Sequence, residues 1–385
     1  MAAPLACGPG KVICEQAVEA GAADLYVGSR RMILPLHQIT PVLQTMGSSA
    51  NGGAEAYFMS LAGAFDRAGI KQSAAIRAHA VRETELGALN IPTRVLPFSK
   101  PLDFTTSRDI AKMATEHNAR VIIAWMNRAA SLTPASTGQH RGWKRIGRLG
   151  GYYKLKNYRG FDALVGNTQD IVDWIIREGW PEDRVHYIPN FARRDPGGII
   201  VRETLDTPPD VPLLLGMGRL HTSKAHDVTL RALQQLPDAY LWIAGDGPDE
   251  AILKSQAQDL GVADRVRFLG WRDDAPSLYR TADLVLFPSR FEPLGNVVIQ
   301  SWAHGVPVIA AKSAGPGALI RDGEDGFLIE IDDAEALAAK TKMLLADKEL
   351  SAKFVANGAQ RVETEFSESA IVAQWRALFD TLGGL

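Results

Sequence analysis

The sequence predicts an α/β protein with two domains, each holding a parallel sheet flanked by helices. The chain has 385 residues, which is long for a single domain. Short apolar runs alternate with amphipathic stretches along most of it, and this alternation is typical of parallel sheets covered by helices. Residues 191–212 are rich in proline and glycine, so we expect a linker there between the two domains.

The composition fits a globular enzyme of the cytoplasm. Hydrophobic residues make up 46% of the chain, charged residues 22%, and the formal net charge is −2. No apolar run reaches the roughly 20 residues of a membrane-spanning helix, and we expect no signal peptide. The two cysteines, Cys7 and Cys14, lie close together and do not indicate a disulfide framework.

The first half begins with an extension that we expect to be poorly ordered, residues 1–37, rich in alanine and glycine. The regular pattern starts with a strand at 39–46, a glycine-rich loop at 47–53 and a helix that ends near Gly69. Further strands are predicted at 73–76, 93–96, 121–125, 144–151, 163–165 and 185–188. Further helices are predicted at 107–117 and 169–178.

The glycine-rich loop is a candidate ligand site. Gly52 and Gly53 lie between a predicted strand and a predicted helix, where bare backbone can approach a ligand and the helix N-terminus favours an anion. Glycine turns are common, so this loop alone does not decide between a ligand site and a simple turn.

The second half opens with a strand at 213–216 and the loop G-M-G-R-L-H-T-S-K-A-H-D. Gly218 permits a tight turn, and Arg219 and Lys224 bring two cations to the start of the next helix. Two cations beside free helix N–H groups suit a diphosphate. The alternative is a solvated basic loop.

Residues 284–317 contain the strongest pattern in the chain. A buried strand at 284–287 is followed by Glu292, a helix at 296–304 and a strand at 306–310. A carboxylate therefore lies where a strand ends and a helix begins, which is where open parallel sheets bind ligands. Ordinary packing with a solvated Glu292 is the alternative.

These motifs resemble the retaining glycosyltransferases of family 4, which have the GT-B fold of two Rossmann-like lobes facing each other across a cleft. The segment F-E-P-L-G-N-V-V-I-Q-S-W-A-H-G-V-P-V-I-A resembles the donor-site signature of that family, with Glu292 as its first acid and Gln300 in place of its second. The loop with Arg219 and Lys224 resembles G-R-L-x-x-x-K-G, with Ala225 in place of the last glycine. Residues 52–55 resemble the family's G-G-A-E loop.

The resemblance implies a domain plan. Residues 38–195 would form the acceptor-side lobe, which ends at an I-P-N motif carried here by Pro189 and Asn190, and 205–365 the nucleotide-sugar lobe. A last helix, at about 366–385, would pack back on the first lobe. Its apolar face could instead cap the second lobe.

The resemblance also implies a donor site. Arg219 and Lys224 would hold the diphosphate, and Glu292 would accept hydrogen bonds from sugar hydroxyls. Gln300 would meet the ribose, with one charge-assisted hydrogen bond lost relative to the family's carboxylate. The remaining donor-binding residues would be Gly52, Gly53, Gly218, Phe268, Leu294, Gly295, Asn296 and Val297. No cofactor and no metal are expected, because the sequence has no Asp-x-Asp and the two cations can stabilise the leaving group.

The group that activates the acceptor is not evident. Many relatives carry a histidine near the end of the strand at 144–151, and this chain has none there. His140 lies nearby and is interpreted as a surface loop residue. Retaining enzymes of this kind can use the leaving phosphate as the base. Asn127, Arg128 and Arg148 are then the acceptor-side candidates.

The resemblance extends to bacterial enzymes of lipopolysaccharide and envelope glycan synthesis, through R-L-G-G-Y-Y-K-L-K-N-Y-R-G-F-D. Eight cations and no acids lie between Arg128 and Arg159, with aromatic residues interleaved. They form either a solvated basic face or a surface for anionic lipid or a phosphorylated acceptor. Nucleic acid is a poorer match for a slightly acidic chain.

We therefore expect a hexosyl-transferring enzyme that uses a nucleoside-diphosphate sugar, UDP-sugar before GDP-sugar. Its acceptor would be a lipid-linked or phosphorylated glycan such as lipopolysaccharide core, met at the cytoplasmic face of the inner membrane by a peripheral protein. Two other hypotheses stay open. Gln300 and the missing histidine would also suit a non-catalytic nucleotide-sugar-binding or scaffold subunit, and a sugar-nucleotide epimerase can share this fold.

Overall fold

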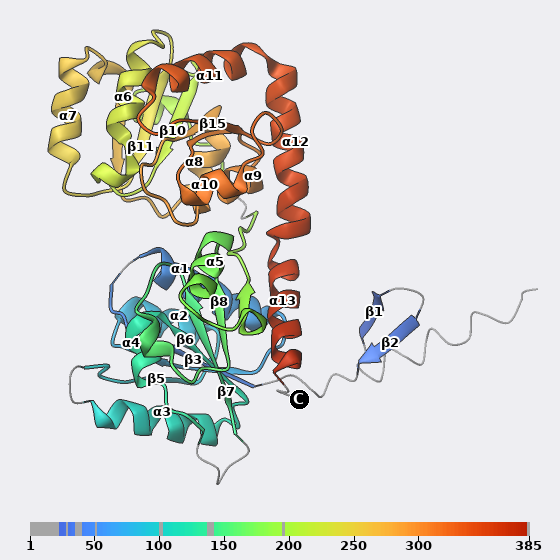
Figure 1. Cartoon of the computed structure of the whole chain (residues 1–385). Coiled ribbons are helices and arrows are strands. Elements are labelled where there is room, and N and C mark those ends of the chain that lie inside the picture. Colours follow the sequence, from blue (N-terminus) through green and yellow to red (C-terminus); the bar gives the residue numbers. More distant parts are fainter. Residues whose placement is uncertain are drawn as a thin grey trace, which may run out of the picture.

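The computed structural model describes residues 23–27, 30–34, 41–50, 52–99, 103–136, 142–194 and 197–382. Two α/β lobes face each other across a cleft, and the chain passes from the lower lobe of Figure 1 to the upper one and back. Both sheets consist of parallel strands, as expected from the alternation of strands and helices. The predicted fold class is therefore confirmed.

The first lobe has a seven-stranded sheet in the order β5-β4-β3-β6-β7-β8-β9. Its strands are β3 (Val42–Met46), β4 (Gln72–Ile76), β5 (Thr93–Val95), β6 (Val121–Trp125), β7 (Lys144–Leu149), β8 (Ala163–Gly166) and β9 (Val185–Tyr187). Its helices are α1 (Gly53–Arg67), α2 (Ala80–Ala88), α3 (Phe104–Glu116), α4 (Met126–Leu132) and α5 (Gln169–Arg177). The order of the strands reverses between β3 and β6, so the loops after these strands border a crevice.

The second lobe has a six-stranded sheet in the order β12-β11-β10-β13-β14-β15, which reverses between β10 and β13. Its strands are β10 (Leu213–Met217), β11 (Tyr240–Ala244), β12 (Val266–Gly270), β13 (Leu284–Phe287), β14 (Val308–Ala311) and β15 (Phe327–Ile329). Its helices are α6 (His226–Gln234), α7 (Glu250–Asp259), α8 (Ala275–Thr281), α9 (Asn296–Ala303), α10 (Ala314–Leu319), α11 (Ala334–Ala346) and α12 (Lys348–Glu365).

The last helix, α13 (Glu368–Thr381), packs on the first lobe although it follows α12 of the second (Figure 1). Its apolar face contributes Ile371, Trp375 and Phe379 to the core of the first lobe. The chain thus crosses between the lobes after β9 and again between α12 and α13. At this point the amide of Ala192 donates to the carbonyl of Phe366 at 3.2 Å, which ties the two crossings together.

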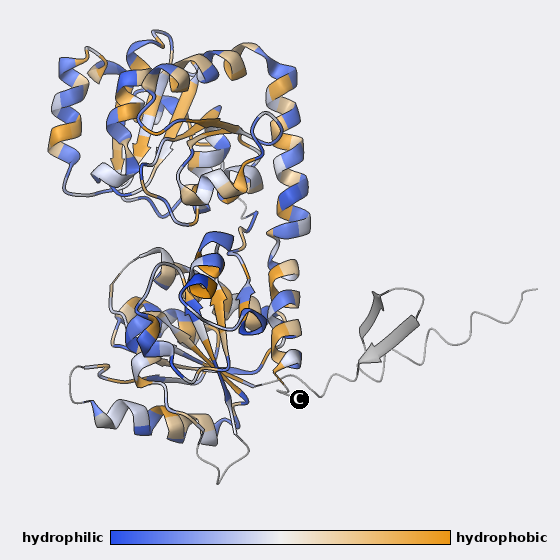
Figure 2. Cartoon of the chain, viewed as in Figure 1, coloured by the Kyte–Doolittle hydropathy of each residue, from blue (hydrophilic) through white to orange (hydrophobic). Residues whose placement is uncertain are grey.

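Apolar residues gather on the strands of both sheets, as Figure 2 shows. Both faces of the central strands are buried, because helices cover each sheet on both sides. No helix among the described residues is long and apolar enough to cross a membrane.

The structure differs from the sequence prediction at the N-terminus. The prediction gave no strand there, whereas β1 (Ala23–Val27) and β2 (Arg30–Leu34) pair as a two-stranded antiparallel sheet. The remainder of the predicted extension lies outside the described residues. Helix α2, which was not predicted either, has a single fully buried aliphatic side chain, Leu86, so its apolar periodicity is faint.

Candidate active site

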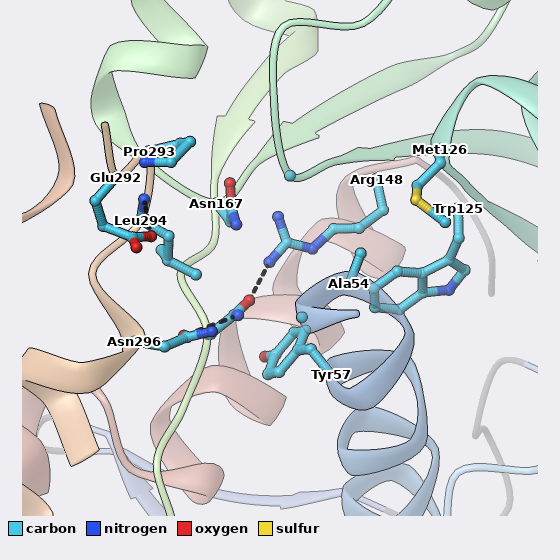
Figure 3. A pocket seen from close by; sticks show the side chains of 13 residues that line it. Ala54, Tyr57, Trp125, Met126, Arg148, Asn167, Glu292, Pro293, Leu294 and Asn296 are labelled. Carbon is cyan, nitrogen blue, oxygen red and sulfur yellow. Dashed lines mark hydrogen bonds between the residues drawn. The ribbon is translucent and has the colours of Figure 1, made fainter. Parts of the chain in front are cut away.

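Two adjoining cavities lie between the lobes. The inner cavity, of about 220 Å³, is lined by Gly53, Ala54, Tyr57, Trp125, Met126, Arg148, Gly150, Asn167 and Asn190 of the first lobe and by Glu292, Pro293, Leu294 and Asn296 of the second (Figure 3). The outer cavity, of about 1520 Å³, is lined mainly by the loops after β10, β11 and β12, with part of α1 and α2 opposite. Gly53 borders both cavities, so they meet at the N-terminus of α1.

Lys224 and Glu292 form an ion pair at the second-lobe side of the inner cavity. The ammonium group of Lys224 donates to Oε2 of Glu292, and their side chains are 24% and 11% exposed. The two residues are 68 positions apart and come from the loops after β10 and β13. Because these strands are neighbours at the sheet reversal, their carboxyl ends bring the predicted cation and carboxylate together.

Arg290 fastens the two loops to each other. Its guanidinium pairs with both carboxylate oxygens of Asp227 at 2.8 and 2.5 Å and donates to the carbonyl of Thr222 at 2.8 Å. Although burial opposes it, the hydrogen bonds from Arg290 hold the pKa of Asp227 below its usual range. The sequence analysis did not identify Arg290, yet its place two residues before Glu292 lets it position both members of the ion pair.

The loop that carries Lys224 ends in a left-handed residue. Ala225, at φ +56°, stands where the family pattern has glycine. A non-glycine residue in this region costs about 1–2 kcal/mol. The side chain of Ala225 is buried in the second-lobe core, so packing compensates part of that cost.

The loop after β13 presents backbone N–H groups to the cavities. Gly295 adopts φ +82° as the N-cap residue of α9, and no side chain caps this helix. The amides of Leu294 and Gly295 donate to Oε1 of Glu292 at 3.4 and 3.2 Å, so backbone and Lys224 together orient this carboxylate. The first N–H groups of α9 face the site where Asn296 and Val297 line the cavities.

On the opposite side, the N-terminus of α1 also lacks a side-chain cap, and its N-cap residue is Gly52. Arg82 stabilises the preceding loop by donating to the carbonyls of Ser48 and Ala50 at 2.7 and 2.8 Å. The carboxylate of Glu55 accepts from the hydroxyl of Ser48 at 2.5 Å. Two uncapped helix N-termini therefore meet at the inner cavity, an arrangement that favours a phosphate.

Arg148 is the acceptor-side candidate that lies in the site. It extends from β7 into the inner cavity and is 2% exposed. Its guanidinium lies over the rings of Tyr57 and Trp125, with the central carbon 5.5 and 6.0 Å from the ring centroids. Burial lowers the pKa of this guanidinium to about 10.

A chain of amide side chains connects Arg148 with the second lobe. Nη2 of Arg148 donates to Oδ1 of Asn190 at 2.8 Å, and Nδ2 of Asn190 donates to Oδ1 of Asn296 at 3.2 Å (Figure 3). Asn190 belongs to the I-P-N motif that the sequence analysis assigned to the end of the first lobe. Its side chain bridges the cleft, a role that no local pattern indicated.

The outer cavity contains the other predicted donor residues of the second lobe. Arg219, Gly218, Val297 and Gln300 all line it. Oε1 of Gln300 accepts from the buried hydroxyl of Tyr279 at 3.1 Å, which orients the amide. Arg219 is exposed and extends toward the cavity rather than into the protein core.

Phe268 is separated from this group. It packs against the second-lobe core, with the ammonium of Lys254 5.6 Å from its ring, and it lines neither cavity. The loop that follows β12 brings Trp271 and Arg272 to the outer cavity instead, and Trp271 is 69% exposed. A role of Phe268 toward a nucleotide base stays a prediction, whereas Trp271 offers a free aromatic face.

Two other acceptor-side candidates lie outside both cavities. Oδ1 of Asn127 accepts from the amide of Lys154 and from Nδ2 of Asn157, both at 3.0 Å, and so joins α4 to the following chain. Arg128 donates to the carbonyl of Phe98 at 3.4 Å. Both residues belong to α4, whose first residue, Met126, lines the inner cavity, whereas Asn127 and Arg128 do not.

The basic run between Arg128 and Arg159 does not form one surface. Lys144 pairs with Asp162 at 3.2 Å at the beginning of β7, while Arg148 is buried near its end. Arg145 donates to the carbonyls of Thr133 and Gly160. The exposed remainder that the structure describes is Lys154, Lys156 and Arg159. His140 and Arg141 lie outside the described residues.

Within the described part of the chain, no three His, Cys, Asp or Glu side chains gather so that they could hold a metal ion. The charged groups in the walls of the inner cavity are the carboxylate of Glu292, with its partner Lys224 behind it, and the guanidinium of Arg148. The site thus combines a neutralised carboxylate, a buried cation and two helix N-termini.

Comparison with protein families identifies both halves of the chain. Residues 51–195 match the model named Glycosyltransferase Family 4, and residues 200–361 match that of Glycosyl transferases group 1. The lipopolysaccharide core biosynthesis glycosyltransferase LpsE of Rhizobium meliloti is 34% identical over 333 residues, which cover 83% of this chain and 94% of the relative. LpsD of the same organism is 34% identical over 332 residues, 86% and 95% of the two chains.

Solved structures share the two-lobe fold. A glycosyltransferase from Rickettsia africae superposes with a TM-score of 0.80 at 19% identity and covers 90% of this chain and 99% of its own. HepE of Anabaena, solved in complex with UDP, has a TM-score of 0.76 at 22% identity, with 90% and 100% coverage. The same protein solved with UDP-glucose has a TM-score of 0.75.

Proposed function

Because this chain belongs to family 4 of the glycosyltransferases, we propose that it moves a sugar, with retention of anomeric configuration, from a nucleoside-diphosphate sugar to a glycan acceptor. The observation that carries the proposal is the Lys224–Glu292 ion pair between two uncapped helix N-termini. A diphosphate leaving group needs cations and N–H donors, and a hexose needs a fixed hydrogen-bond acceptor.

In this mechanism Lys224 and Arg219 bind the diphosphate, whose negative charge grows as the glycosidic bond breaks. The positive ends of α1 and α9 add to that stabilisation without a metal ion. Glu292, oriented by Lys224 and by the amides of Leu294 and Gly295, accepts hydrogen bonds from hydroxyls of the transferred sugar. These groups are fixed before the substrate arrives, which lowers the cost of reorganisation.

The acceptor proton passes to the departing phosphate. The inner cavity is lined by one carboxylate, that of Glu292, and its ion pair with Lys224 makes it a poor proton acceptor. No histidine lines the inner cavity, and His79 of the outer cavity uses Nδ1 to accept from the amide of Arg82 at the start of α2. The leaving phosphate is then the base within reach, and attack on the same face of the sugar retains its configuration.

UDP-sugar is the donor that we favour, with GDP-sugar next. The support is a fold shared with HepE, which was solved with UDP and with UDP-glucose. In this chain Trp271 offers an aromatic face to a base at the outer cavity, and Gln300 offers an amide to a ribose hydroxyl.

The acceptor that we propose is a lipid-linked or phosphorylated glycan such as lipopolysaccharide core. The support is the similarity to LpsE and LpsD, which extends over most of both relatives. An enzyme with this acceptor works as a peripheral protein at the cytoplasmic face of the inner membrane. The exposed Lys154, Lys156 and Arg159 suit contact with anionic lipid.

The test is a release assay with the purified full chain and a panel of UDP-, GDP-, ADP- and dTDP-sugars, each with and without core glycolipid. We expect UDP to appear, faster when the glycolipid is present. Binding of donor without any release would favour a scaffold subunit. Conversion of the sugar into an isomer without acceptor would favour an epimerase. Product with inverted configuration would contradict the proposed mechanism.

A further inference from the structure

Arg148 is a buried cation without a carboxylate partner in the part of the chain that the structure describes. Its hydrogen bonds go to neutral oxygens, Oδ1 of Asn190 at 2.8 Å and the carbonyl of Leu149 at 3.3 Å. Its Nε is buried and has no hydrogen-bond partner. Burial of a charge in this way is costly unless a counter-charge arrives, and the rings of Tyr57 and Trp125 offset only part of that cost.

A second buried polar group without a hydrogen-bond partner lies near Arg148. Asn167 is 5% exposed, lines the same cavity, and its Oδ1 has no hydrogen-bond partner. In Figure 3 the side chains of Arg148 and Asn167 extend toward each other at the rim of the inner cavity. A guanidinium whose Nε has no partner and an amide whose oxygen has none, both in the lining of one cavity, match a ligand with an anionic group and a hydroxyl donor.

The charge balance identifies the anionic group. Lys224 already neutralises Glu292 across the cavity, so Arg148 leaves one positive charge uncompensated. A carboxylate carries one negative charge, and its two oxygens fit a guanidinium edge. The two helix N-termini, Lys224 and Arg219 are assigned to the donor diphosphate, so Arg148 remains as a single cation for a group with one negative charge.

We infer that the inner cavity binds a sugar that carries a carboxylate, with Arg148 pairing the carboxylate and Asn167 accepting a hydrogen bond from a neighbouring hydroxyl. This inference rests on the proposed function, because it specifies the substrate class of that same site. The carboxylated sugar is either the transferred residue, a uronate, or the acceptor residue. Arg148 is in both cases the residue that selects it.

The first test does not depend on a nucleotide. Binding of free methyl glucuronide and methyl glucoside is compared by ligand-observed NMR with the wild-type protein and Arg148→Met. We expect the glucuronide to bind about tenfold more tightly than the glucoside, and this preference to vanish in the variant. Arg184→Met is the matched control: Arg184 lies 5.6 Å from the ring centroid of Trp180, donates to carbonyls and lines neither cavity.

The second test separates the two sources of the carboxylate. Calorimetry compares UDP-glucuronate with UDP-glucose, using UDP as the reference that lacks a sugar. A preference for UDP-glucuronate that needs Arg148 identifies the donor. Equal donor affinities, together with faster UDP release from UDP-glucose in the presence of methyl glucuronide than of methyl glucoside, identify the acceptor.

Asn167→Asp provides a variant that keeps Arg148. The carboxylate introduced at position 167 would pair with Arg148 in place of the carboxylate of the ligand. The preference for the glucuronide should therefore fall, as it does in Arg148→Met. The inference is overturned if the wild-type protein does not prefer the carboxylated glycoside, or if Arg148→Met and Arg184→Met behave alike. Loss of sugar transfer with every donor would count against the proposed function, while the preference for the free glycoside would remain measurable.

Discussion

The two walls of the inner cavity treat their charges in opposite ways. The second-lobe wall, formed by the loops after β10 and β13, pairs Lys224 with Glu292 and Arg290 with Asp227. The first-lobe wall, formed by the ends of β6, β7 and β8 and the start of α1, holds Arg148 without a counter-ion among the described residues. A balanced wall is stable without ligand, whereas an unbalanced wall gains stability when an anion binds. The second-lobe wall is therefore charge-balanced before a ligand binds, whereas the first-lobe wall is not.

The largest loss of activity should come from removing one partner of the ion pair in the second-lobe wall. In Lys224→Ala the diphosphate loses a charge-assisted contact, and Glu292 stays half-buried without its partner. Together these losses should lower kcat/KM about 100-fold or more, on the order of 3 kcal/mol. Steady-state kinetics would measure it, with Lys353→Ala on the exposed side of α12 as the control. A rate within threefold of wild type would remove Lys224 from the leaving-group site.

Acid should weaken the second lobe through His226, at the start of α6. Burial lowers its pKa to about 4, and neither ring nitrogen has a hydrogen-bond partner. The unfolded chain takes up a proton near pH 6.5, so stability is full above that pH and falls as the pH drops toward 4. The loss should reach about 2–3 kcal/mol at pH 4.5.

Urea unfolding at pH 7 and pH 4.5 would measure this loss in wild type and in His226→Leu. The variant should lose less stability between the two values than wild type does. His117→Leu, in the first lobe, should retain the wild-type difference. Equal pH dependence in wild type and His226→Leu would exclude this imidazole as the acid-sensitive group.

A third prediction concerns the outer surface of the first lobe. Lys154 and Lys156 are exposed next to α4, unlike Lys144, which is paired with Asp162, and Arg148, which is buried. Exchange of both for glutamine should weaken binding to vesicles of anionic lipid about tenfold at low salt, at about 1 kcal/mol or less per charge. Sedimentation with vesicles would test it, with Lys348→Gln on α12 as the control. Unchanged binding would mean that these residues are only a solvated surface.

The smallest change, in donor affinity, should come from placing a carboxylate at position 300, where the family pattern has an acid. Gln300→Glu would give a ribose hydroxyl a charged acceptor, while the hydroxyl of Tyr279 could still donate to it. Donor binding should tighten about fivefold, roughly 1 kcal/mol. Calorimetry with UDP-glucose would measure it against Gln258→Glu on the exposed face of α7. Weaker binding in Gln300→Glu would contradict the assignment of Gln300 to the ribose.

The second-lobe wall could be predicted from the sequence because its chemistry follows strand ends. Lys224 and Glu292 each come shortly after a recognisable buried strand, and parallel strands present their carboxyl ends at one edge. Glycine at 295 and the charged loop before α6 were visible for the same reason. The role of Arg290 could not be predicted from the sequence, because its partners, Asp227 and Asp332, are distant from it along the chain.

The first-lobe wall could be predicted only in part. Arg148 belongs to a run of cations that looks uniform in the sequence. Lys144, however, lies at the start of β7 and Arg148 near its end, so the two side chains are at opposite ends of the strand. Burial of Arg148 and the bridge through Asn190 depend on how the second lobe approaches the first. Asn127 was selected from the same segment, but it lies outside both cavities and hydrogen-bonds to Lys154 and Asn157.

The backbone hydrogen bond between Ala192 and Phe366 affects how the two lobes can move relative to each other. Because this hydrogen bond holds the two interlobe segments side by side, we expect the lobes to move about that one edge of the cleft. A small swing about that edge leaves the nearby contacts intact and opens the far mouth of the cavities most. Substrates would therefore enter and leave through the side opposite α12 and α13.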